Sequence, residues 1–315
     1  MPDSQTKTSL FVEVARLYYE HDYSQQEIAN KLGLSRPSIS RILRQARERG
    51  IIRIEINDPS NRGTILEDKI RQRFHLEKVI IVPDAGPSTD LLKSRLGSAA
   101  ANYLDRLIQE DVVLGVSWGT TMQEVAGHLR SRPVKGVKVV QLNGGVSRAG
   151  YDTRASEVAQ TIAEKYQAVP FLLPLPAIVD RAELKEAILS DRNISRTLKL
   201  ARSASIAMFT VGAFDYDSVL VKADYFEPAE VEFLLKNRAV GDICSRIITD
   251  AGDICSNELN ARTIGIDLKE LHKKPYSIAV AGGSKKARAI YAGILGRHFN
   301  VLITDEGVAM KLLEF

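Results

Sequence analysis

The sequence predicts an α/β protein in which a small helical unit precedes a larger, doubly wound domain with a mostly parallel sheet. Three observations carry this prediction. Helical apolar spacings fill the first 50 residues, a turn-rich stretch follows at 57–63, and short apolar runs then alternate with helical patterns. Since 315 residues fit about two domains, we expect a helical domain at 1–58, a linker with a linking helix at 59–76, and an α/β domain at 77–315.

The composition is that of a soluble globular protein. Hydrophobic residues make up 44% of the chain and charged residues 26%, which excludes wholesale disorder and a disulfide scaffold. No apolar stretch approaches the roughly 18 residues that cross a membrane, and the N-terminus lacks the pattern of a secretory signal. With two cysteines in the chain, we expect a reduced, cytoplasmic protein that does not enter a membrane.

The N-terminal segment contains the start and stop signals of three helices. Residues 8–22 carry apolar side chains at helical spacing. Ser24 and Glu27 have the spacing of a capping box, which begins a second helix that Gly33 ends. A third helix begins after a further serine cap and stops at Gly50.

The second and third helices have the spacing of a helix-turn-helix. Ala29 is small where the third helix must cross, and Gly33 supplies the tight turn. Further apolar residues would complete a small core: Ile28, Leu32, Leu34, Ile39 and Ile42. These positions alone also fit an ordinary helical hairpin, but the glycine, the cap and the basic outer face favour DNA binding. A strand at 51–56 would form a wing beside the groove.

Basic residues concentrate on this motif. Between Lys31 and Arg53 lie seven bases and one acid, a charge of +6, whereas the whole chain carries +4 and the remainder therefore −2. A basic segment on a nearly neutral body is typical of binding to an anionic partner, here double-stranded operator DNA. The alternative is a solvated helix face.

The outer face of the third helix supplies the candidate DNA contacts. Residues near its N-terminus would reach base edges or nearby phosphates, and these are Ser35, Arg36, Pro37, Ser38 and Ser40. Later bases would bind phosphates, which position without specifying sequence; these are Arg41, Arg44, Arg47 and, on the wing, Arg53. Because such modules usually bind in pairs on two half-sites, a homo-oligomer is expected.

Six apolar runs predict the strands of the second domain, at 79–82, 112–116, 137–142, 206–211, 277–281 and 301–303. Helical patterns separate the runs, which implies parallel strands with helices on both faces of the sheet. Small-residue loops follow several of these runs. The carboxyl ends of parallel strands share one edge of the sheet, so these loops would converge on one crevice.

The loops hold the candidate ligand-binding residues. The first group, Gly119, Thr120 and Thr121, would open a helix whose N–H groups and hydroxyls can bind an anion. Two further groups follow strands, and these are Asn143, Gly144 and Gly145, and Gly282 and Gly283 with Lys286. Lysine beside such loops favours phosphate, although tight strand–helix packing would also explain the glycines. Neither a Walker motif nor a GxGxxG fingerprint occurs, so no nucleotide cofactor is expected.

Asp242 lies in an otherwise apolar segment, where a carboxylate could accept hydrogen bonds from sugar hydroxyls or cap a helix. The five histidines lack metal-ligand spacing, so no metal is expected. Ser117 lacks the context of a nucleophile elbow, and no catalytic residue is predicted. The pentapeptide Gly-Asp-Ile-Cys-Ser occurs twice, at 241–245 and 252–256, and nothing in the sequence gives this duplication a function.

Several segments form a joint pattern that is more specific than any of them alone. They lie at 17–19, 24–29, 34–41, 119–121, 144–145, 239–242 and 281–283, with Lys286. In this order, over nearly the whole chain, they resemble the SorC family of bacterial sugar-binding transcriptional regulators. Within the family, the chain most resembles the branch that controls deoxyribonucleoside operons.

The resemblance implies a winged helix-turn-helix joined to an effector domain similar to ribose-phosphate isomerases and glucosamine-phosphate deaminases. It also implies tetramers on operator DNA and a phosphorylated sugar as effector. By this resemblance, residues 119–121 would hold the phosphate, Asp242 and Lys286 would address the sugar and its phosphate, and Asn143 would face the ligand. In the deoxyribonucleoside branch a lysine can stand at the position of Asn143. A lysine amine can form a Schiff base with a sugar aldehyde, whereas an asparagine amide cannot.

The first functional hypothesis is a repressor of a sugar or deoxyribonucleoside catabolic operon, a dimer or tetramer switched by a phosphorylated sugar such as deoxyribose 5-phosphate. A second is a sugar-phosphate isomerase or deaminase with a DNA-binding tail, although no His or Glu motif supports catalysis. A third is an architectural DNA-binding protein with a vestigial pocket.

Overall fold

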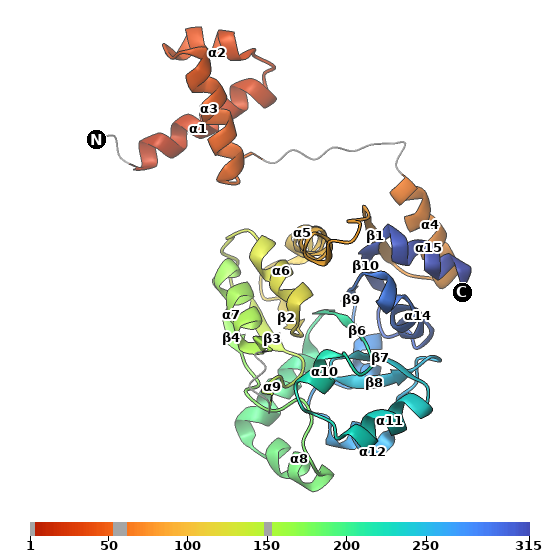
Figure 1. Ribbon diagram of the computed structural model, residues 1–315. Coiled ribbons are helices and arrows are strands. Elements are labelled where there is room, and N and C mark those ends of the chain that lie inside the picture. The colour runs from red at the N-terminus through yellow and green to blue at the C-terminus, as the bar shows by residue number, and fades with distance from the viewer. Residues whose placement is uncertain (1–3, 53–61, 148–152) are drawn as a thin grey trace. The chain divides into compact units, whose positions relative to one another are not determined.

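The computed structural model describes residues 4–52, 62–147 and 153–315 (Figure 1). Contacts divide the chain into two units, Met1–Ser60 and Asn61–Phe315. Helix α4 (Arg62–Phe74), which the sequence placed in a linking segment, packs against strand β1 and helix α15 of the second unit. None of the helices in the described ranges is long and apolar enough to span a membrane.

The first unit consists of α1 (Ser4–Tyr19), α2 (Gln25–Leu32) and α3 (Arg36–Glu48). Both hydrogen bonds of the predicted capping box are present, between Ser24 and Glu27. Gly33 ends α2 at a φ of 64°, a left-handed conformation that glycine adopts without strain.

A small core holds the three helices together: Val14, Leu17, Ile28, Ala29, Ile39 and Leu43. Two expectations for this unit were wrong. Leu34 is not in the core but 36% exposed, because it lies in the turn between α2 and α3. The first helix ends at Tyr19 rather than 22. Of the expected wing strand, the first two residues, 51 and 52, are not in a strand, and the rest, including Arg53, lies outside the described residues.

The second unit is built on a sheet of seven parallel strands. From edge to edge these are β1 (Lys78–Val82), β10 (Val301–Asp305), β9 (Tyr276–Val280), β5 (Ile206–Phe209), β2 (Val113–Val116), β3 (Lys138–Gln141) and β4 (Val169–Phe171). Six of the seven coincide with the predicted apolar runs. β4 was not predicted, because its three residues include Pro170 and two side chains that are exposed.

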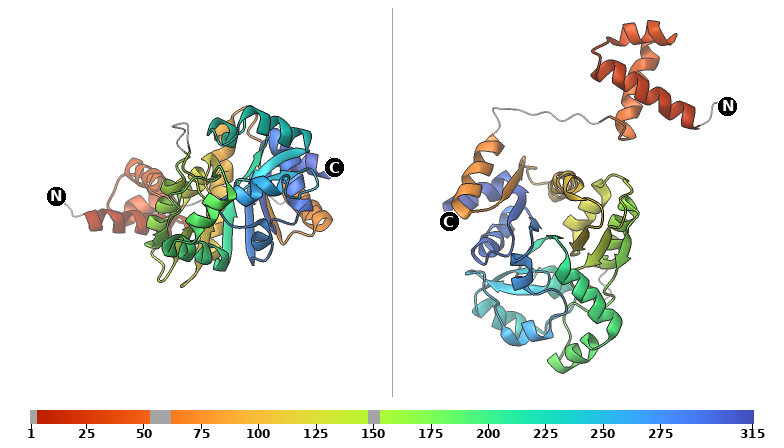
Figure 2. Two further views of the ribbon diagram at one scale, coloured as in Figure 1. Left: turned by 90° about the horizontal axis from the view of Figure 1, so that it is seen from below. Right: turned by 180° about the vertical axis from the view of Figure 1, so that it is seen from behind.

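Helices cover both faces of the sheet (Figures 1 and 2). Alternate side chains of the strands enter two separate cores: Leu302 joins one, while Val301 and Ile303 join the other. The first core contains side chains of α4, α9 (Arg192–Ser203), α14 (Ala287–Leu295) and α15 (Glu306–Glu314). The second contains those of α5 (Thr89–Leu107), α6 (Thr120–His128) and α7 (Ala155–Tyr166). This is the doubly wound architecture that the sequence predicted.

A second, three-stranded antiparallel sheet consists of β6 (Val211–Ala213), β7 (Ala239–Ile243) and β8 (Arg246–Thr249). It shares a third core with α10 (Val219–Lys222), α11 (Pro228–Lys236) and α12 (Asn257–Arg262). The remaining helices are α8 (Ala182–Leu189) and α13 (Leu268–His272), with a 3₁₀ turn at Ser284–Lys286.

The order of the strands places a crevice between β2 and β5. The chain runs outward from β2 to β3 and β4, then returns to β5 and runs outward on the other side to β9 and β10. The helices that follow β2 and β9, which are α6 and α14, pack on opposite faces of the sheet. Ligands of open α/β sheets bind at such switch points, outside the carboxyl ends of the strands.

Candidate functional site

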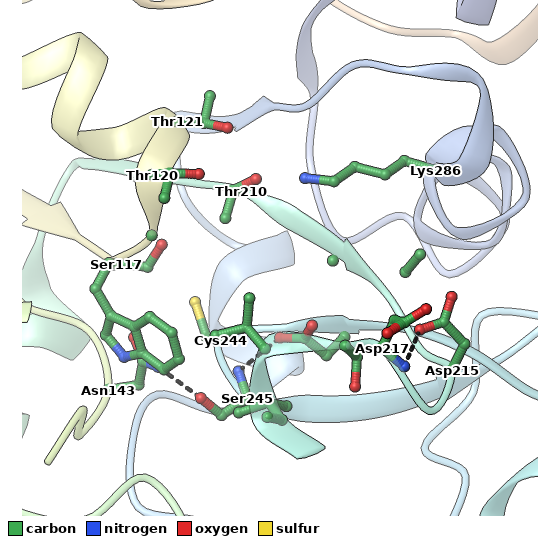
Figure 3. A pocket seen from close by; sticks show the side chains of 18 of the residues that line it. Ser117, Thr120, Thr121, Asn143, Thr210, Asp215, Asp217, Cys244, Ser245 and Lys286 are labelled. Carbon is green, nitrogen blue, oxygen red and sulfur yellow. Dashed lines mark hydrogen bonds between the residues drawn. The ribbon is translucent and has the colours of Figure 1, made fainter. Parts of the chain in front are cut away.

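A cavity of about 320 Å³ lies at this switch point (Figure 3). Its walls come from the ends of β2, β3, β5 and β9 and from the small sheet. Its lining includes Ser117, Gly119, Thr120, Thr121, Asn143, Thr210, Asp215, Asp217, Ser218, Asp242, Cys244, Ser245, Lys285 and Lys286. This volume falls at the lower end of the range for small-molecule sites.

The N-terminus of α6 opens into the cavity. Its N-cap, Gly119, has a φ of 125° and a ψ of 162°, a conformation that only glycine adopts readily. This residue offers no side chain, so the helix has no side-chain cap. The first N–H groups of a helix have no partner within it and carry a partial positive charge. With the hydroxyls of Thr120 and Thr121 beside them, they form a site suited to an anion.

The ammonium group of Lys286 approaches from the opposite wall. In Figure 3 it points toward the hydroxyls of Thr121 and Thr210. Burial lowers the pKa of Lys286, and the nearby carboxylate of Asp242 acts in the opposite direction. A phosphate at this end of the cavity would therefore meet a helix N-terminus, several hydroxyls and one partly desolvated cation.

Asp242 lies in strand β7, so its interpretation as a helix cap is wrong. Its Oδ2 accepts a hydrogen bond of 3.3 Å from the backbone N–H of Ser245. Burial raises the pKa of Asp242 to about 6, and the charge of Lys286 partly opposes that rise. The carboxylate is thus a desolvated acceptor, a type of group that binds sugar hydroxyls well.

Unpartnered polar atoms gather on the cavity. Within the described ranges, eight buried side-chain atoms lack a hydrogen-bond partner, and four of them belong to residues that line it. These four are Ser117 Oγ, Asn143 Oδ1, Thr210 Oγ1 and Ser218 Oγ. Buried polar atoms are rarely left unpaired in native proteins, so this concentration indicates that a polar ligand completes the site.

The structure brings together six of the ten predicted ligand-binding residues. Gly119, Thr120, Thr121, Asn143, Asp242 and Lys286 all line the cavity. The other four are the glycines 144, 145, 282 and 283, which are not among its lining residues. A Cβ on Gly144 would lie 2.4 Å from the carbonyl oxygen of Pro176, and one on Gly145 would lie 2.4 Å from the Cβ of Ala155. A Cβ on Gly282 would lie 2.5 Å from Asp305 Oδ2, an atom that accepts a hydrogen bond from the N–H of Gly283. Tight packing accounts for glycines 144, 145 and 282, whereas position 283 has room for a Cβ and favours glycine through its φ of 93°.

Sequence reasoning missed several lining residues, among them Thr210, Asp215, Cys244 and Ser245. Thr210 lies within the predicted run at 206–211, as its one polar residue between β5 and β6, which was a usable signal. Cys244 and Ser245 end the first copy of the duplicated pentapeptide, at 241–245. In the structure, this copy forms β7 and its turn. The second copy ends at Ser256, which caps α12 outside the cavity.

Helix α3 carries the candidate DNA interface. Its core side consists of Ile39, Leu43 and Ala46. The side chains of Arg36, Ser40, Arg41, Arg44 and Arg47 are exposed, and that of Ser38 is half-buried. Ser35 caps the helix by accepting the N–H of Ser38, and Pro37 lies in the first turn, where its missing N–H costs little. The spacing of 36, 40, 44 and 47 places these four on one helix face beside the core side, and Arg41 lies opposite the core.

Comparison with known proteins finds relatives of both domains. A family model described as "Putative sugar-binding domain" matches residues 58–314, and a Crp-like helix-turn-helix domain matches residues 11–61. The Deoxyribonucleoside regulator of Bacillus subtilis is 40% identical over 307 residues, which cover 98% of each chain. The crystal structure of the full-length Sorbitol Operon Regulator SorC from Klebsiella pneumoniae superimposes with a TM-score of 0.83 at 28% identity, over 99% of this chain and 100% of that one. The chain belongs to the SorC family of transcriptional regulators.

This SorC-family regulator therefore combines a DNA-binding helix-turn-helix with a sugar-binding domain. A further relative is the Sorbitol operon regulator of Klebsiella pneumoniae, 28% identical over 97% of this chain and 98% of that one. These relatives are named as regulators and not as enzymes. The alternative of an isomerase or deaminase with a DNA-binding tail is thereby set aside. Among the described residues, no cluster of His, Cys, Asp or Glu could hold a metal ion.

Proposed function

We propose that this regulator is a repressor of a sugar or deoxyribonucleoside catabolic operon, and that a phosphorylated sugar in the cavity weakens its hold on operator DNA in the cytoplasm. The observation that carries the proposal is the uncapped N-terminus of α6, which faces Lys286 across a cavity with unpartnered polar atoms. Deoxyribose 5-phosphate is the first candidate, because the Bacillus relative at 40% identity is named as a deoxyribonucleoside regulator.

In this proposal the two ends of the ligand bind differently. Thr120, Thr121 and the N–H groups of α6 hold the phosphate together with Lys286. Asp242 and Asn143 bind the sugar. Because residue 143 is an asparagine and not a lysine, the sugar binds reversibly through hydrogen bonds and forms no Schiff base with that residue.

The operator is bound by α3 in the major groove. Arg36, Ser38 and Ser40 contact bases or adjacent phosphates, and the later arginines of the helix contact phosphates. A dimer or tetramer places two such helices on two half-sites. The ligand changes operator affinity because it binds one arrangement of this oligomer more tightly than another. The resulting coupling free energy is typically about 1–3 kcal/mol.

The test is a titration of operator duplex, selected from random sequences, followed by fluorescence anisotropy. We expect deoxyribose 5-phosphate to raise the operator Kd about five- to 100-fold, and unphosphorylated deoxyribose to leave it unchanged. Lys286→Met should abolish the response while leaving DNA binding intact. Lys269→Met, which removes an exposed lysine of α13 outside the cavity, is the matched control. An equal response to the unphosphorylated sugar would contradict the proposed phosphate site.

A further inference from the structure

The turn between β7 and β8 is strained. Ile243 pairs with Arg246, so Cys244 and Ser245 form a two-residue hairpin loop. Both have positive φ angles, 49° and 66°. Hairpins of this kind prefer Asn-Gly or Asp-Gly, because residues with larger side chains are strained in the left-handed region. Such conformations persist where the surrounding structure enforces them, and they often mark functional positions.

The residue that follows the turn anchors it. Arg246 is 2% exposed, and its guanidinium forms an ion pair of 2.8 Å with Asp267. The same group donates hydrogen bonds to the carbonyl oxygens of Ile266 and Gly265, at 2.7 and 3.0 Å, and to Asn260. A buried arginine with this many partners fixes the start of β8, and thereby holds the strained turn against the cavity.

Ser245 is hydrogen-bonded to both side chains that would bind the sugar, Asn143 and Asp242. Figure 3 shows its bond with Asn143. Its backbone N–H donates to Asp242 Oδ2, and its Oγ accepts a 2.9 Å hydrogen bond from Asn143 Nδ2. Asn143 is 1% exposed, and one of the two N–H donors of its Nδ2 is occupied in this way. Its Oδ1 is left buried without a partner. Asn143 and Asp242 therefore both present hydrogen-bond acceptors to the cavity.

We propose that Ser245 is a positioning residue that sets the selectivity of this end of the cavity. The cavity then accepts phosphorylated sugars whose sugar end is uncharged and donates hydroxyl hydrogens, and it excludes phosphorylated sugar acids. The inference rests on the proposed function, in which a sugar phosphate binds at α6. A hydroxyl can donate to Asn143 Oδ1 and to the carboxylate of Asp242. The carboxylate of a sugar acid has no proton to donate, leaves that buried oxygen unpaired and faces a like charge.

The selectivity is tested with two ligands that differ only at C1. Ribose 5-phosphate is an aldose, and 5-phosphoribonate carries a carboxylate in place of the aldehyde; deoxyribose 5-phosphate is added as a third ligand. Titration calorimetry at pH 7.5 should show binding of both aldoses, with the Kd of the acid about ten- to 100-fold higher than that of ribose 5-phosphate. Equal or tighter binding of the acid would overturn this inference alone. Binding of none of the three would overturn the proposed function and this inference with it.

The role of Ser245 itself is tested with Ser245→Ala. This variant keeps the N–H that binds Asp242 but frees Nδ2 of Asn143, which can then turn toward a carboxylate. We expect the ratio of the Kd of 5-phosphoribonate to that of ribose 5-phosphate to fall toward one. An unchanged ratio would overturn the positioning role.

The matched control is Ser277→Ala. Ser277 is 1% exposed, and its Oγ donates to the carbonyl oxygen of His298, outside the cavity. That variant should lose stability and keep the wild-type ratio. If Ser245→Ala does not fold, Asn143→Asp serves instead, because it adds a negative charge where the proposal places an acceptor. It should raise the Kd of 5-phosphoribonate relative to that of ribose 5-phosphate further. A lower ratio would contradict the proposal.

Discussion

The amide of Asn143 donates a 2.9 Å hydrogen bond to the hydroxyl of Ser245, a residue 102 positions further along the chain. The first residue follows β3 of the parallel sheet, and the second lies in the turn of the small antiparallel sheet. A ligand in the cavity would thus contact both sheets, whose side chains meet in one shared core.

Substitution of Asp242 by asparagine should stabilise the ligand-free protein at neutral pH. Burial raises the pKa of Asp242 from 3.8 to about 6, so the folded protein binds this proton more readily than the unfolded chain. The charged carboxylate therefore opposes folding above pH 6, by no more than about 3 kcal/mol, and this cost disappears as the pH falls toward 4. Lys286, Asp215, Asp217 and Lys285 also face this cavity, so the comparison needs the same buffers throughout.

Thermal unfolding of Asp242→Asn and wild type between pH 4 and pH 8 measures this effect. The Tm advantage of the variant should be largest above pH 6 and shrink below it. The variant should also bind the sugar phosphate more weakly, because an amide replaces the charged acceptor. An advantage that grows as the pH falls would contradict the desolvated environment of Asp242.

Gly119→Ala should reduce stability by about 1–3 kcal/mol. A Cβ would lie 3.4 Å from the Cγ2 of Thr210, so there is room for it, but the φ of 125° disfavours any residue with a side chain. Urea denaturation measures the loss. Gly127→Ala in the same helix, where a Cβ meets nothing within 4 Å, should instead be neutral or slightly stabilising. Equal effects of the two substitutions would contradict the strained cap.

Charge reversal at Arg44 should weaken binding to every duplex by a similar factor, about tenfold, because a phosphate contact is lost. The slope of log K against log salt should fall by about 0.9 for each contact removed. Arg16→Glu on α1 is the control, since Arg16 is also an exposed arginine paired with a glutamate four residues away. A relaxed base preference at unchanged salt slope would instead place Arg44 on a base.

Arg246→Met should destabilise the protein by about 3 kcal/mol, because several buried carbonyl oxygens and Asp267 lose their partner. Arg238 supplies a matched control. It also pairs with an aspartate at 2.8 Å, but its side chain is 72% exposed, so Arg238→Met should cost only about 0–1 kcal/mol. Chemical denaturation measures the free energy of unfolding of both variants. Similar losses would show that Arg246 does not anchor the turn.

The elements that the sequence predicted well are those that depend on neighbours in the chain. The box of Ser24 and Glu27 and the stop at Gly33 act within one helical turn, so their outcome does not need the rest of the fold. The central parallel strands are also readable, because strands buried on both faces give continuous apolar runs.

What the sequence could not predict depends on distant contacts. Strand β7 was missed because Ala-Val-Gly-Asp-Ile is not an apolar run; it is a strand because it pairs with β6 and β8. Ser245 enters the site through the β7–β8 turn and through a partner 102 residues away. Gly144 and Gly282 looked like ligand-binding glycines, but whether a glycine serves packing or binding depends on what a Cβ would meet.

The most direct test of the central claim is thermal unfolding of the full chain with deoxyribose 5-phosphate, ribose 5-phosphate and unphosphorylated deoxyribose. A ligand at about 100 times its Kd adds roughly 2.7 kcal/mol to the free energy of unfolding, which raises Tm by several degrees. We predict an upward shift with at least one of the two sugar phosphates, none with deoxyribose, and loss of the shift in Lys286→Met. No shift with either phosphate, or an equal shift with deoxyribose, would contradict the cavity as a sugar-phosphate site.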